Sequence, residues 1–100
     1  MPTKITFIID NPADPAAFEQ AWTGLRPHAD ELPKIQRVES AKVWPKEDGT
    51  PTPAYRQLDL YFASYEDASA AVTAPAAGAL VGGLVQAGVT FTGLFSDIEA

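Results

Sequence analysis

The sequence contains no cysteine and a single histidine. Without cysteine, the chain has no disulfides and no thiolate to act as a nucleophile or a metal ligand. One histidine without a second at helical spacing gives no ligand cluster, so we expect no metal site. Neither a G-x-G-x-x-G nor a G-x-x-x-x-G-K-S/T motif occurs, and we expect no cofactor.

Basic residues are also scarce, because only seven lysines and arginines stand against thirteen acidic residues, for a net charge of −6. A nucleic-acid-binding chain needs a basic stripe to meet phosphates, and an excess of carboxylates repels an anionic membrane surface. We therefore expect neither nucleic acid nor a membrane as a partner.

Long hydrophobic runs are absent. The longest weakly polar run, residues 76–89, contains Gln86 and four glycines, and it is shorter than the roughly 20 residues that a bilayer requires. The first ten residues alternate apolar with polar and lack the apolar core of a signal peptide. A cytoplasmic protein is the expectation.

The clearest helix signal begins at Asp14, which can cap the free N–H groups of a helix that starts with Pro15. Apolar residues then follow at helical spacing: Phe18, Ala21, Trp22 and Leu25. Pro27 predicts a kink near Arg26, and Pro33 ends the segment. A second helix is predicted from Tyr65, with an interruption at Ala74-Pro75, and the Gly78 and Gly82 pair is interpreted as a point of close helix packing.

Alternating patterns predict strands over residues 3–10, 36–44, 55–62 and 89–95, and a polar tail over 96–100. A loop rich in proline, residues 45–53, separates the second strand from the third. The order strand, helix, strand, strand, helix, strand predicts an α+β, ferredoxin-like βαββαβ domain over residues 1–100. Its four-stranded antiparallel sheet would carry two helices on one face.

The opposite face of that sheet would be bare. The pattern places Tyr61 and Trp44 there, and such a surface is too apolar to leave in water. Covering it with a second copy of the chain predicts a homodimer.

Three segments resemble the EthD family: D-P-A-A-F-E-Q-A-W at 14–22, L-P-K-I at 32–35 and Y-R-Q-L-D-L-Y-F-A-S-Y-E-D at 55–67. The resemblance implies a dimeric α+β barrel, in which two sheets close around a cavity, within a superfamily that includes small oxygenases, lactone isomerases and polyketide cyclases. The family's first helix usually ends in His-x-Pro, whereas Leu25 stands two residues before Pro27 here. His28 lies three residues later.

Asp59, flanked by Gln57 and Tyr61 on the same side of a strand, is the foremost catalytic candidate, because a carboxylate facing an enclosed cavity suits acid–base chemistry. Tyr61 beside it and His28, the only imidazole, are the others. A solvated strand face and a surface histidine are the plain alternatives.

Gln57 and three aromatic residues are the candidates for contact with a ligand: Trp44, Trp22 and Phe7. The helical spacing of Phe18 and Trp22 also fits core packing. We therefore expect a homodimer whose inter-sheet cavity binds a small apolar or aromatic molecule, with cofactor-free acid–base or oxygenation chemistry as one option. A non-catalytic accessory or structural dimer is the alternative.

Overall fold

Strand β1 (Thr3–Ile9) runs through the middle of a four-stranded sheet in the computed structural model, which describes residues 1–99. It pairs antiparallel with β3 (Arg56–Phe62) on one side and with β4 (Phe91–Asp97) on the other. Strand β2 (Arg37–Lys42) adds to β3, so the order is β2-β3-β1-β4. The predicted ferredoxin-like α+β fold is confirmed. Ala100, the last residue of the predicted domain, lies outside the described residues.

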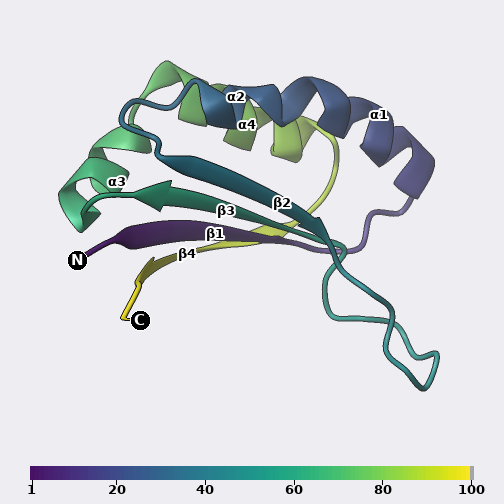
Figure 1. Cartoon of the computed structure of the whole chain (residues 1–100). Coiled ribbons are helices and arrows are strands. Elements are labelled where there is room, and N and C mark those ends of the chain that lie inside the picture. The colour runs from purple at the N-terminus through teal and green to yellow at the C-terminus, as the bar shows by residue number, and fades with distance from the viewer. Residues whose placement is uncertain (100) are drawn as a thin grey trace.

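All the helices lie on one face of this sheet (Figure 1). Both predicted helices are broken by proline, so the layer consists of four segments: α1 (Pro15–Leu25), α2 (Pro27–Asp30), α3 (Tyr65–Ala71) and α4 (Pro75–Gln86). Asp14 caps α1 by accepting a 3.1 Å hydrogen bond from the Ala17 amide, and Ser64 caps α3 in the same way.

The core lies between the helices and the sheet. Alternate residues of the two central strands point into it, namely Ile5, Phe7 and Ile9 from β1 and Leu58, Leu60 and Phe62 from β3. Phe18 and Trp22 of α1 stack with their ring centroids 5.9 Å apart and close the core from above. The apolar stripes of the sequence are therefore the packed surfaces of the fold.

The close helix approach occurs at Gly83, not at the predicted pair Gly78 and Gly82. A Cβ atom on Gly83 would overlap the Leu25 side chain of α1, whereas a Cβ atom on either of the other two would meet nothing within 4 Å. The G-x-x-x-G interpretation was wrong, because neither Gly78 nor Gly82 lies against another helix.

The strands also differ from the predictions at their ends: β2 ends at Lys42 and not at residue 44, and β4 begins at Phe91 and not at residue 89. β4 continues through Ser96 and Asp97, which were predicted to be a polar tail, because they pair with Lys4 and Thr3 of β1. Tyr55 precedes β3 and turns to the helix side, where its hydroxyl donates a 3.0 Å hydrogen bond to Glu19 of α1. It therefore does not share a face with Asp59.

No single helix within residues 1–99 is long and apolar enough to cross a membrane. The segments α3 and α4 meet that measure of length and composition only when taken together, and they are bent by 65° at the break between them.

Candidate functional site

The face of the sheet away from the helices has no helix over it (Figure 1). The register of the strands defines the residues of this open face: Lys4, Thr6, Ile8, Arg37, Glu39, Ala41, Gln57, Asp59, Tyr61, Thr92, Leu94 and Ser96. The three predicted residues Gln57, Asp59 and Tyr61 are thus brought together on one surface.

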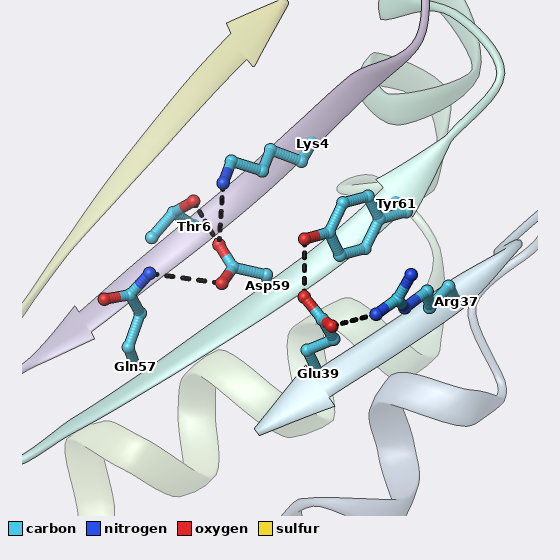
Figure 2. Close-up of polar contacts among 7 residues, drawn as sticks. All are labelled: Lys4, Thr6, Arg37, Glu39, Gln57, Asp59 and Tyr61. Atoms are coloured by element: carbon cyan, nitrogen blue, oxygen red, sulfur yellow. Dashed lines mark hydrogen bonds and ion pairs between the residues drawn. The ribbon is translucent and has the colours of Figure 1, made fainter. Parts of the chain in front are cut away.

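Asp59 lies at the centre of the open face and is only 8% exposed. Thr6, directly opposite on β1, donates a 2.5 Å hydrogen bond to Asp59 Oδ1, and Gln57 Nε2 donates one of 3.1 Å to Oδ2. The Lys4 ammonium lies 3.8 Å from Oδ1 (Figure 2). The carboxylate is therefore held by three side chains from two adjacent strands.

Tyr61 belongs to a second cluster on the same face. Its hydroxyl donates a 2.5 Å hydrogen bond to Glu39 of β2, and Arg37 binds the other oxygen of that carboxylate (Figure 2). The hydrogen bond from Tyr61, together with the charge of Arg37, lowers the pKa of Glu39, and the bond to Glu39 raises the pKa of Tyr61. Tyr61 is therefore kept protonated, with its hydroxyl directed at Glu39 and not at Asp59.

Two cations flank the Tyr61 ring. The Lys4 ammonium lies 5.9 Å from the ring centroid and the Arg37 guanidinium 5.4 Å from it. The open face thus combines an aromatic surface with two carboxylates and two basic groups.

His28 is not part of this group. It lies on α2 in the helix layer, across the sheet from Asp59, with Nδ1 3.9 Å from the Glu31 carboxylate near the end of the same helix. Leu25, which stands where the family's histidine is expected, packs against Gly83 of α4 and partly against the core. Neither residue reaches the open face.

The aromatic candidates Phe7 and Trp22 also lie on the helix side, which corrects the expectation that they contact a ligand between two sheets. Phe7 points into the core, where it helps to line an apolar cavity of about 40 Å³ beneath the helices. Trp22 is 5% exposed and packs on Phe18, with the Arg56 guanidinium 5.7 Å from its ring. The sheet separates both side chains from Asp59.

Trp44 lies just beyond the end of β2 and is 87% exposed. It was predicted to share a strand face with Tyr61, but β2 ends at Lys42, so Trp44 is not on the sheet face that carries Tyr61. Trp44 is two residues past Lys42, in the loop.

Sequence reasoning missed Lys4 and Thr6, which contact Asp59, and Glu39, which contacts Tyr61. The alternation in residues 3–9 and 37–42 placed all three on the polar sides of their strands. The alternation does not reveal the strand order and register, and these bring the three residues beside Asp59 and Tyr61. No group of three or more acidic or histidine side chains within residues 1–99 is arranged to hold a metal ion.

The chain is similar to known proteins in sequence and in fold. No family model matches the chain. A protein of Rhodococcus erythropolis, described as an uncharacterised 11.0 kDa protein in the thcB-thcC intergenic region, is 34% identical over 100 residues, which cover 96% of this chain and 94% of that protein.

Solved structures show the same fold. An EthD family protein from Bacillus halodurans is 17% identical and superposes with a TM-score of 0.89 over 99% of this chain and 100% of its own. A dimeric protein with a ferredoxin-like fold from Bacteroides fragilis is 10% identical, with a TM-score of 0.71 over 97% and 95% of the two chains. SnoaB, a cofactor-independent oxygenase from Streptomyces nogalater, is 10% identical, with a TM-score of 0.69 over 99% and 94%. The resemblance noted in the sequence is thus matched by the fold.

Proposed function

We propose that this chain, which belongs to the same family as the Rhodococcus erythropolis protein and has the fold of an EthD family protein, forms a homodimer through its open face and binds a small, largely apolar or aromatic molecule between the two sheets. Asp59 is the group that meets the polar atom of this molecule. The chemistry that follows from this contact needs no cofactor.

The observation that carries the proposal is the burial of Asp59 on a face that no helix covers. A carboxylate in the middle of a sheet surface is costly to desolvate unless it is paired, and three side chains pair it here. A residue that only kept the surface soluble would lie in water. This arrangement suits a carboxylate prepared for an enclosed site.

The dimer is supported by the apolar residues around this cluster. Leu94 is 46% exposed, and Ile8 lies diagonally across from it on β1. Tyr61 adds an aromatic ring to the same surface. A second copy related by a two-fold axis would cover this surface with an equal one, and structural neighbours with this fold are described as dimeric.

The proposed chemistry begins at Asp59 Oδ2. Its partner Gln57 is an amide that can turn aside, so a hydroxyl of the bound molecule can donate to Oδ2 in its place. Transfer of that proton to Asp59 leaves a negative charge on the molecule next to the Lys4 ammonium. Such an anion is the species that acid–base chemistry or cofactor-free oxygenation uses.

The second candidate is a dimer without catalysis or ligand, in which side chains fill the space between the sheets. It is favoured by the complete satisfaction of the polar groups, since every buried side-chain nitrogen and oxygen within residues 1–99 has a hydrogen-bond partner. A cluster that only stabilises the sheet would have the same property.

Sedimentation tests the dimer with two matched variants. Leu94→Arg places a charge on the open face and is expected to give monomers, whereas Val85→Arg places the same charge on an exposed position of α4 and is expected to leave the dimer intact. A wild-type chain that stays monomeric at micromolar concentration, with an unfolding midpoint independent of concentration, would exclude the proposed assembly.

A crystal structure of the dimer grown with 1-naphthol tests the binding site. We expect the aromatic rings between the two sheets and the hydroxyl within hydrogen-bond distance of Asp59. A packed and dry interface that excludes the probe would instead establish the non-catalytic dimer.

A further inference from the structure

The loop between β2 and β3, residues 43–55, extends past the ends of the strands on the side of the sheet away from the helices (Figure 1). Apart from its first and last residues, Val43 and Tyr55, the loop makes no backbone hydrogen bonds that extend the sheet. We call residues 43–55 the arm. It lies on the side of the sheet where a second copy would cover the open face.

The arm has a defined shape. At its tip, Asp48 accepts hydrogen bonds from the Thr50 amide at 3.0 Å and the Thr50 hydroxyl at 2.6 Å, and Gly49 adopts the left-handed conformation that the turn requires, with φ of 79°. Pro45, Pro51 and Pro53 fix further backbone angles. The turn and the prolines reduce the conformational freedom that the arm would lose on binding.

The base of the arm is attached to the body of the protein. The Tyr55 amide donates to the Ile9 carbonyl of β1 at 2.7 Å, and the Asn11 side-chain amide donates to the Thr52 carbonyl at 2.9 Å. These bonds fix the base of the arm beside the end of β1.

A large apolar side chain is left uncovered on this ordered arm. Trp44 is 87% exposed and makes no aromatic or cation–π contact within the described residues, whereas Trp22 is buried. A surface hollow of about 310 Å³ lies beside it, lined by Lys42, Val43, Trp44 and Pro45. An indole and an adjoining hollow presented together are a surface for contact with another molecule.

We propose that the arm of each protomer reaches over the edge of the other and that Trp44 closes one end of the partner's inter-sheet cavity. This inference rests on the proposed homodimer and adds to it a residue that each cavity receives from the other chain. A second copy is the occupant that the position favours, because the arm adjoins the face through which the copies would meet. An anionic membrane surface is disfavoured by Glu47 and Asp48 at the tip.

The test labels the wild-type chain with 5-fluorotryptophan, which gives two ¹⁹F resonances, and Trp44→Phe assigns them. Solvent exposure of each indole is measured by the broadening that a soluble gadolinium chelate produces. The wild-type dimer is compared with the Leu94→Arg monomer, and Trp22 serves as the internal control because it is buried in each protomer.

We expect Trp44 to be shielded in the dimer and exposed in the monomer, with Trp22 shielded in both. If Trp44 is as exposed in the dimer as in the monomer, the proposed contact between the arm and the partner is wrong, while the proposed dimer is unaffected. Shielding of Trp44 in both states would mean that the arm closes over its own chain, which also overturns the proposal. Failure of the wild-type chain to dimerise would overturn the proposed function itself.

Discussion

The hydroxyl of Thr6 on β1 donates a 2.5 Å hydrogen bond to the carboxylate of Asp59 on β3, and the two residues face each other directly across the strand pair. Both are buried although no helix covers them. The bond therefore links the two central strands on the open face of the sheet. On the helix face, the apolar core links the same strands.

Replacing Thr6 by valine keeps the shape of the side chain and removes this donor. Because the Asp59 carboxylate then loses a buried partner, we expect the free energy of unfolding to fall by about 1–3 kcal/mol. Urea titration measures it. Thr92→Val is the matched control, since Thr92 also lies on the open face but is exposed, and a change within about 0.5 kcal/mol is expected there. Equal effects in the two variants would show that the bond contributes nothing.

Asp59→Asn tests whether the carboxylate is used for function or for stability. The Asn oxygen still accepts from Thr6, and Gln57 can turn its amide so that its carbonyl meets the new NH₂ group. We expect the free energy of unfolding to change by about 1 kcal/mol or less, and the affinity of the dimer for 1-naphthol to fall by about 1 kcal/mol or more.

Asp97→Asn is the control for the same chemical change at an exposed strand position, where the carboxylate accepts from Thr3. It should leave the affinity for 1-naphthol unaltered. A loss of stability on the order of 3 kcal/mol in Asp59→Asn would instead identify the carboxylate as half of a structural ion pair with Lys4.

Much of the fold could be predicted because its signals are local. Asp14, Ser64 and the prolines at 15, 27 and 75 set the helix ends through their own backbone chemistry. The alternation of β1 and β3 likewise separated the core face from the open face, since successive strand side chains point to opposite sides.

The partners of the site depend on information that is not local. The cation beside Asp59 is Lys4 of β1, and it lies there because β1, as well as β2, adjoins β3. Alternation within a strand does not fix which residue of the next strand lies opposite. The same holds for the extension of β4 to Asp97, which exists through its pairing with β1.

The contact between Gly83 and Leu25 predicts opposite effects for two neighbouring substitutions. Gly83→Ala forces Leu25 to move, so we expect a net loss of stability of about 1 kcal/mol or more from overpacking. Gly82→Ala meets no atom and removes a poor helix former, so a gain of up to about 1 kcal/mol is expected. Thermal or urea unfolding measures both. A stabilising Gly83→Ala would mean that Leu25 has free space to turn into.

Glu19 of α1 makes the stability of this protein depend on acid pH. Arg56 binds its carboxylate with two hydrogen bonds and Tyr55 donates a third, and the bonds to Arg56 are the main reason that the pKa of Glu19 lies below its ordinary value of 4.5. A lowered folded-state pKa contributes stability above the unfolded-state pKa and loses it as the pH falls through the folded-state pKa. The loss should therefore begin near pH 4.5 and increase below it.

Glu19→Gln removes the titrating group but keeps the shape of the side chain. We expect the variant to be less stable than the wild type at neutral pH and to approach it as the pH is lowered, because only the wild type loses the interaction with Arg56. The free energy of unfolding from urea titrations at pH values between about 6 and about 3 measures the two curves. Glu47→Gln in the exposed arm should run parallel to the wild type throughout. If Glu19→Gln also runs parallel, the bonds to Arg56 do not distinguish the folded from the unfolded chain, and Glu39, whose pKa is lowered by Tyr61 and Arg37 on the open face, becomes the carboxylate to replace next.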